Sequence, residues 1–191
     1  MRTILAGFLI LATGAAAMLR RPESPIPARL LREITAISGA EAPRLSDLPL
    51  SVRISGPNPT GKFMLAENTS PVRYVYIGRV NTCRAGGCDA PARDADATGR
   101  SEFFEYYILY DESGKILLTR VFNYEATHGQ EITVKGWLRQ FAGYGGRGDL
   151  TVGKEIDAIA GATISVYGIT ADVVARTRGL REYLDSRHGP E

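Results

Sequence analysis

The pattern of apolar and polar residues predicts a run of strands followed by helices. Strands are predicted at Lys62–Glu67 and at Val72–Val80, and the second segment is rich in β-branched and aromatic residues. Two further β-rich segments, Glu102–Tyr110 and Lys115–Tyr124, lie on either side of a polar turn that ends in Gly114. This arrangement is typical of an antiparallel hairpin.

Helical spacing predicts three helices. One is expected at Ile132–Ala142, and a longer one from Thr163 to Leu184, where apolar or semi-polar residues recur at steps of three and four. A short helix is expected at Ala28–Ser38. The residues predicted to face the core are Val134, Trp137, Leu138 and Phe141 in the helix after the hairpin, and Val166, Ile169, Val173, Thr177, Leu180 and Leu184 in the long helix. Strands followed by helices predict an α+β domain with a mainly antiparallel, twisted sheet and helices packed on it.

The charges are nearly balanced once the N-terminal segment is set apart. The 191 residues include 23 basic and 21 acidic side chains, and residues 1–21 hold Arg2, Arg20 and Arg21 without an acid. Without these three, 20 basic residues stand against 21 acidic ones. Nucleic-acid binding requires clustered positive charge, so we expect no nucleic-acid partner.

The first 21 residues have the pattern of an export segment. Thr3–Leu19 is uncharged and apolar, follows Arg2, and has three alanines near its end, as in a secretory signal. Its length also allows an uncleaved N-terminal anchor helix. Either alternative places the rest of the chain in the periplasm or on the extracytoplasmic face of the membrane. Residues 22–60, which hold most of the prolines, are interpreted as a lead-in, and residues 61–187 as the folded domain.

The chain has two cysteines, Cys83 and Cys88, separated by four residues that include two glycines. In an oxidising compartment this spacing favours a disulfide that closes a small loop. A redox-active pair is the alternative, because so short a loop adds little stability. Two thiolates alone make a poor metal site, since structural zinc takes four ligands.

The segment Asp157–Ser165 (DAIAGATIS) carries the strongest chemical signal. Small residues and Gly161 lead directly into the long predicted helix, whose first residue is Thr163. The free amides and the positive end of the helix dipole at such a position favour an anion, and a phosphate in particular. The alternative is that Thr163 is only a helix cap.

This segment resembles the flavinylation motif of the FMN-binding domain family, which includes the small flavin subunits of Rnf and Na⁺-pumping NADH:quinone reductase complexes and related exported proteins. In that family an acidic residue precedes Ser/Thr-Gly-Ala-Thr, and a flavin transferase joins the last Thr to the phosphate of FMN. By this resemblance Asp157 is the acidic residue and Thr163 bears the flavin, with Gly161 and Ala162 between them. Ala160 departs from the family's Ser/Thr and lacks its hydroxyl.

A second segment, Tyr124–Ile132 followed by Trp137 and Gln140-Phe141, resembles the upstream part of exported single-domain members. The Glu-Thr-Pro-Gly-Leu-Gly segment of the ion-pump subunits is absent from the sequence. The cofactor-binding residues that the resemblance implies are Asp157, Ala160, Gly161, Ala162, Thr163 and Ile164, together with His128 and Trp137. His128 is alternatively a hydrogen-bonded residue at a strand-to-helix junction. Candidates for the walls of a flavin slot are Tyr124, Trp137, Phe141, Tyr144 and Tyr167.

The resemblance implies an exported flavoprotein that carries electrons through FMN bound as a phosphoester to Thr163. Its implied partners are the flavin transferase that matures it and membrane or periplasmic redox proteins that give and take electrons. No side chain is needed as a catalytic acid or base, because the flavin supplies the redox chemistry. Two alternatives remain: non-covalent binding of FMN, and a flavin-free module that docks to a membrane redox complex.

Overall fold

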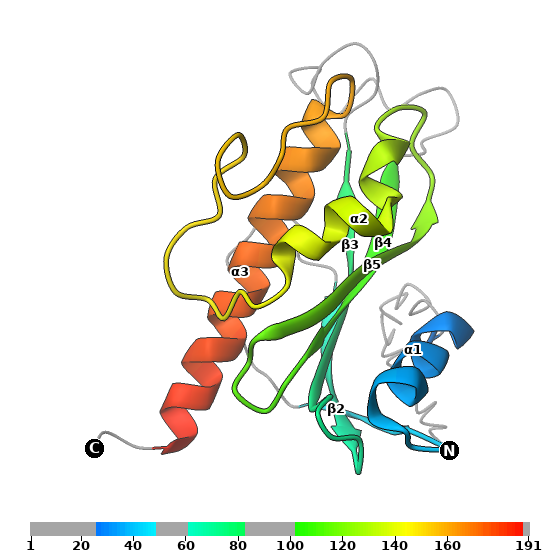
Figure 1. Cartoon of the computed structure of the whole chain (residues 1–191), viewed down its shortest axis with the longest axis vertical. Coiled ribbons are helices and arrows are strands. Elements are labelled where there is room, and N and C mark those ends of the chain that lie inside the picture. The colour runs from blue at the N-terminus through cyan, green and yellow to red at the C-terminus, as the bar shows by residue number, and fades with distance from the viewer. Residues whose placement is uncertain (1–25, 49–60, 83–101, 189–191) are drawn as a thin grey trace, which may run out of the picture.

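The computed structural model describes residues 26–48, 61–82 and 102–188. The predicted export segment and the predicted disulfide residues Cys83 and Cys88 lie outside the described residues. Five antiparallel strands form one sheet in the order β1-β2-β3-β4-β5 (Figure 1). The strands are β1 (Arg44–Asp47), β2 (Gly61–Glu67), β3 (Tyr74–Asn81), β4 (Phe103–Tyr110) and β5 (Ile116–Tyr124). The predicted α+β class with an antiparallel sheet is therefore confirmed.

The predicted hairpin joins β4 to β5. Asp111 organises its turn, because its carboxylate accepts hydrogen bonds from the Ser113 hydroxyl at 2.8 Å and from the Lys115 amide at 2.9 Å. Gly114 has a φ of +78°, in the left-handed region where glycine carries no steric penalty. Local turn chemistry thus accounts for the pairing next to the turn, where Tyr110 lies opposite Ile116.

Helices cover both faces of the sheet. One face packs against α3 (Thr163–His188) and a short helical segment made of η2 (Gln130–Thr133), α2 (Lys135–Leu138) and η3 (Arg139–Phe141). The other face packs against α1 (Ala28–Ser38) (Figure 1). Along β4, Tyr106 and Ile108 join the core under α3, whereas Tyr107 and Leu109 join the core under α1. This double coverage explains why β4 is apolar at nearly every position rather than at alternate ones.

Part of the proline-rich lead-in belongs to the folded body. The predicted helix Ala28–Ser38 is confirmed as α1, and its residues Leu30 and Ile34 are fully buried against the sheet. β1 follows α1 and pairs with β2, with Asp47 opposite Met64. The chain before β2 therefore covers one sheet face with α1 and supplies the edge strand β1.

The predicted continuous helix Ile132–Ala142 is wrong. Val134 has an extended backbone, with φ −66° and ψ 121°, and it divides the segment into short helical pieces. Val134 is also 56% exposed, although the spacing predicted that it faces inward. Trp137, Leu138 and Phe141 are buried as predicted. The short helical pieces still place Trp137, Leu138 and Phe141 in the same hydrophobic core as residues of α3 and the sheet.

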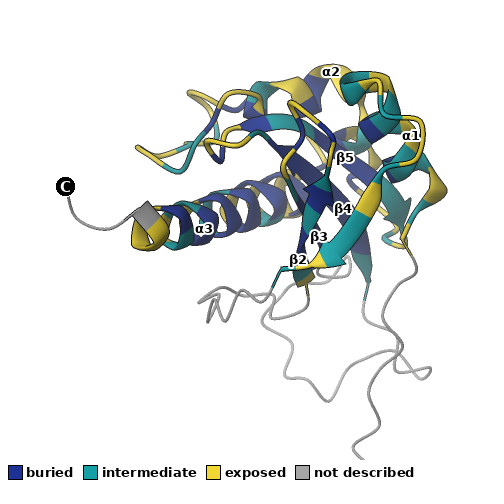
Figure 2. Cartoon of the chain, turned by 90° about the horizontal axis from the view of Figure 1, so that it is seen from below, coloured by how far each residue is buried: buried dark blue, intermediate teal, exposed yellow. Residues whose placement is uncertain are grey.

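The long predicted helix is confirmed as α3, which begins at Thr163 and ends at His188. All six residues predicted to face the core from it are buried, and Figure 2 shows buried residues along α3 and in the sheet. Within the described ranges, no helix is long and apolar enough to cross a membrane.

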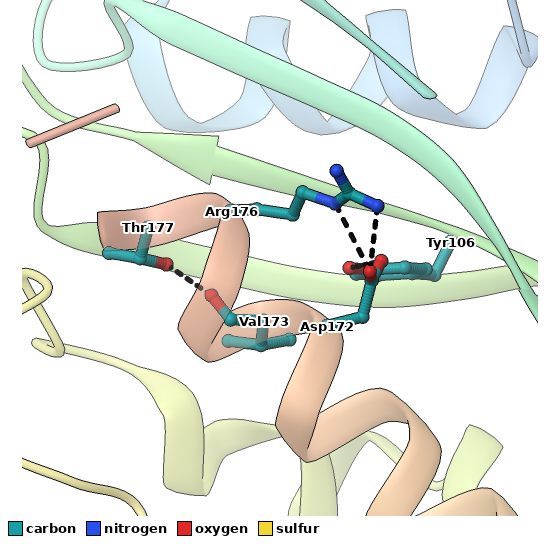
Figure 3. A network of polar contacts seen from close by, with 5 residues as sticks. All are labelled: Tyr106, Asp172, Val173, Arg176 and Thr177. Carbon is teal, nitrogen blue, oxygen red and sulfur yellow. Dashed lines mark hydrogen bonds and ion pairs between the residues drawn. The ribbon is translucent and has the colours of Figure 1, made fainter. Parts of the chain in front are cut away.

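Polar side chains also hold α3 to the sheet. In Figure 3 the carboxylate of Asp172 lies between the Arg176 guanidinium and the hydroxyl of Tyr106 on β4. Asp172 and Arg176 are buried, and the distance between Oδ1 and Nη2 is 2.8 Å. Burial raises the pKa of Tyr106 well above its ordinary value, and the nearby Asp172 charge adds to the shift. Tyr106 therefore stays protonated and donates to the carboxylate.

Candidate functional site

The first turn of α3 is set by a tight turn just before it. Gly161 has a φ of +82°, and a Cβ built there would meet nothing within 4 Å. The Ala162 amide donates to the Ile159 carbonyl at 3.1 Å, and the Val166 amide donates to the Ala162 carbonyl at 2.9 Å. The helix thus begins at Thr163, as the sequence pattern predicted, and its first amides point away from the helix without intrahelical partners.

Thr163 lies on an exposed face of the first turns. Thr163 is exposed, and so are two large apolar residues close to it on the helix, Ile164 at 45% and Tyr167 at 57%. Ser165 and Val166 are buried on the opposite side. Positions three and four apart share a helix face, so Thr163, Ile164 and Tyr167 form one surface, which we call the Thr163 face.

The two segments that the sequence analysis singled out meet at this point of the fold. The Tyr124 hydroxyl lies 3.0 Å from the Ser165 hydroxyl in the first turn of α3. A Cβ built on Gly129 would lie 2.6 Å from the Ser165 oxygen, so the loop after β5 passes directly over that hydroxyl. Although 41 residues separate Tyr124 and Ser165 in sequence, the fold brings them into contact.

A second connection joins the same segments through Asp157. The indole N–H of Trp137 donates to the Asp157 carbonyl at 2.9 Å, and the Asp157 amide donates to the Gln140 side-chain oxygen at 2.7 Å. Both backbone groups of Asp157 are therefore held by the α2–η3 segment. The residue itself is exposed, so its carboxylate remains in contact with solvent.

The structure separates the predicted cofactor-binding residues into two groups. The exposed ones are His128, Asp157, Ala160, Gly161, Thr163 and Ile164. Ala162 and Trp137 are buried, and Trp137 acts through its hydrogen bond to the Asp157 backbone. Ala160 is exposed and brings no hydroxyl to the turn.

The aromatic candidates for the walls of a flavin slot also differ in burial. Phe141 is fully buried and packs edge-on against Trp137, with their ring centroids 5.5 Å apart. Tyr144 is buried, and its hydroxyl donates to the Gly148 carbonyl. Tyr167 alone among these five aromatic residues is exposed, and Tyr124 is half-buried. A flat ring at the Thr163 face would thus meet Tyr167 rather than Phe141 or Tyr144.

Two residues of the site had no role in the sequence-based prediction. The Ser165 hydroxyl is hydrogen-bonded to the Tyr124 hydroxyl, and the Gln140 side-chain oxygen accepts a hydrogen bond from the Asp157 amide. Ser165 follows Thr163 by two residues, and this spacing places it on the buried side of the helix. The helical periodicity could have identified Ser165 as a buried hydroxyl in need of a partner, but nothing local to the sequence identifies Tyr124 as that partner.

Tyr124 is electrically neutral at this site. Burial raises the pKa of Tyr124, while the hydrogen bond with Ser165 opposes the shift and the nearby Glu131 and Glu102 charges add to it. The hydroxyl therefore keeps its proton at neutral pH and remains a hydrogen-bond donor.

Neither a model of a known protein family nor a curated protein matches this chain. The resemblance to FMN-binding domains therefore rests on the motif residues alone.

Proposed function

We propose that this chain is an exported flavoprotein that carries electrons through FMN bound as a phosphoester to Thr163. The observation that carries the proposal is the placement of Thr163. It is exposed at the first position of a 26-residue helix, directly after an open glycine turn, and the second motif segment packs against the same helical turn.

The first turn of α3 fits a phosphate. Its unpaired amides and the helix dipole favour a negative group next to the Thr163 hydroxyl. The space beside Gly161 that a Cβ would occupy is open, so a phosphate can approach the backbone there. These features hold and orient the phosphate.

The Thr163 face fits the flavin ring. Exposed apolar groups next to a tethered aromatic ligand give it a surface on which to pack, and Tyr167 offers an aromatic ring. FMN, when bound, accepts and donates the electrons. The protein's contribution is attachment, orientation and partial cover from water.

The proposal includes the location and partners of the chain. Residues 1–21 would serve as a signal or an N-terminal anchor helix, and the domain would act in the periplasm or at the extracytoplasmic face of the membrane. A flavin transferase would mature it there, and membrane or periplasmic redox proteins would exchange electrons with it.

Mass spectrometry of the full chain produced with a flavin transferase tests the attachment. We expect a mass gain equal to FMN less one water, because the flavin's phosphoryl group replaces the hydrogen of the Thr163 hydroxyl. Thr163→Val should abolish the gain. The matched control is Thr151→Val, which removes a hydroxyl from another exposed threonine and should keep the gain. Wild-type protein without added mass, or a gain that persists in Thr163→Val, would refute covalent attachment.

Ala160 favours one alternative, non-covalent binding of FMN at the same face. The usual hydroxyl is missing at this exposed position, so it cannot assist attachment. Denaturation separates the two proposals, because a non-covalent flavin is released and an ester-bound flavin stays with the chain. If the missing hydroxyl prevents attachment, Ala160→Ser should convert a releasable flavin into a retained one.

A further inference from the structure

Three tyrosine hydroxyls of the sheet contact α3 at successive points along its length. The pairs are Tyr124 with Ser165 at 3.0 Å, Tyr106 with Asp172 at 2.7 Å and Tyr110 with Thr177 at 3.2 Å. Tyr124 lies at the end of the helix that carries Thr163, and Tyr110 makes a chemically similar contact twelve residues further along.

The direction of the hydrogen bonds at Tyr124 follows from proton counting. A phenol has one proton, and Tyr124 donates it to the His128 carbonyl at 2.5 Å. Ser165 must therefore donate its own proton to the Tyr124 oxygen. This single oxygen connects the loop after β5 to the first turn of α3.

The surroundings of Tyr124 hold its ring in one orientation. The ring stacks on Phe104, with centroids 5.7 Å apart and planes inclined by 8°. Gly129 has a φ of +88° and closes over the two hydroxyls, because a Cβ there would lie 2.9 Å from the Tyr124 oxygen. The hydroxyl therefore has little freedom to choose other partners.

We propose that Tyr124 is a positioning residue for the flavin-bearing threonine. This inference rests on the proposed attachment of FMN at Thr163. Through Ser165, Tyr124 fixes the rotation of the first helical turn, and through the His128 carbonyl it fixes the loop beside that turn. Together these bonds set the direction in which Thr163 presents its hydroxyl to the transferase.

Tyr124→Phe tests the role with little change in packing. The variant keeps the ring on Phe104 and removes only the hydroxyl. Its matched control is Tyr110→Phe, which removes a tyrosine hydroxyl that also bonds a hydroxyl of α3, away from Thr163. Ser165→Ala is the second test variant, because it removes the other side of the same bond.

The measurement is the rate of FMN attachment by the transferase at varied concentrations of the full-length protein. For Tyr124→Phe we expect kcat to fall on the order of tenfold with little change in KM, since misplacement of a reacting group by about 1 Å costs up to about 100-fold in rate. The variant keeps every residue of the Thr163 face, which the transferase must contact, so we expect binding to be retained. Tyr110→Phe should keep both constants near those of the wild type, even where its thermal stability drops equally.

The double variant Tyr124→Phe/Ser165→Ala should be no slower than the slower single variant, because both changes break one connection. Equal rates for Tyr124→Phe and Tyr110→Phe would overturn the inference, and so would full additivity of the two changes. A wild-type protein that takes up no FMN at Thr163 would overturn the proposed function itself, and this inference with it.

Discussion

Tyr106 donates a hydrogen bond to Oδ2 of Asp172, and Arg176 binds Oδ1 of the same carboxylate at 2.8 Å from the next turn of α3. Each of these residues is buried. A buried ion pair stabilises a protein only while every member keeps its partners, because an isolated charge in the interior is strongly unfavourable. The centre of α3 is therefore sensitive to single substitutions.

Asp172→Asn should lower the free energy of unfolding by about 3–5 kcal/mol, because it leaves the Arg176 charge buried without its counter-ion. Urea unfolding of the full chain measures the change. The control is Asp185→Asn, which breaks an exposed ion pair with Arg181 on the same helix and should change the free energy by about 1 kcal/mol or less. Similar decreases in the free energy of unfolding in the two variants would contradict the claim that burial makes the Asp172–Arg176 pair sensitive to substitution.

Tyr107→Phe should leave the protein as stable as the wild type or raise the free energy of unfolding by about 1 kcal/mol. The Tyr107 hydroxyl is buried in the core under α1, and it has no hydrogen-bond partner in the described part of the chain. Tyr106→Phe provides the contrast, since it removes a bonded hydroxyl and should lower the free energy. Chemical denaturation at neutral pH compares them, and a clear loss in Tyr107→Phe would show that its hydroxyl has a partner.

Alkaline pH should increase the difference in the free energy of unfolding between Tyr107→Phe and the wild type, in favour of the variant. Burial raises the pKa of Tyr107 from 10 to about 12, and the nearby Glu33 charge adds to the shift. A raised pKa in the folded state gives stability that is fully present below pH 10 and is lost as pH rises through about 12. The phenylalanine variant lacks this loss, so the difference in free energy should grow across that range. A difference independent of pH would contradict the raised pKa.

Gly78→Ala should lower the free energy of unfolding by about 1–3 kcal/mol through overpacking. Gly78 lies opposite Gly61, and the ring of Tyr76 covers both, so a Cβ at either position would overlap the ring. Gly136→Ala is the control, because a Cβ there meets nothing within 4 Å. The change in melting temperature should differ in sign or size between the two variants. Equal melting temperatures would refute the overlap.

Gly161→Ala should affect both stability and FMN attachment. Its φ of +82° is unfavourable for alanine by about 1–2 kcal/mol. Gly153→Ala is the control, since Gly153 also has a positive φ, +90°, and open space around it. The two variants should lose similar stability, whereas only Gly161→Ala should slow attachment by blocking the approach of a phosphate. Equal attachment rates would show that Gly161 serves the turn alone.

Local sequence signals accounted for β2 to β5, the β4–β5 hairpin and α3, whereas the four-residue strand β1 was not predicted. Short-range properties explain these elements: β-branched and aromatic content in β3 to β5, turn chemistry at Asp111, and apolar residues at steps of three and four in α3. Helical spacing failed to predict the structure between residues 132 and 142. Val134 has helical spacing in the sequence, yet its extended backbone interrupts the helix and exposes its side chain.

The sequence by itself determined where Thr163 stands, because a glycine turn followed by helical spacing specifies the first residue of α3. Only the tertiary structure decided what surrounds it. Tyr124 of β5 reaches Ser165 of α3, and Trp137 of α2 reaches the Asp157 backbone, because these segments pack around one hydrophobic core. It also decided that α1 covers the second sheet face. The periodicity of a sequence predicts which side chains are buried, whereas the packing of distant segments determines which residues those side chains contact.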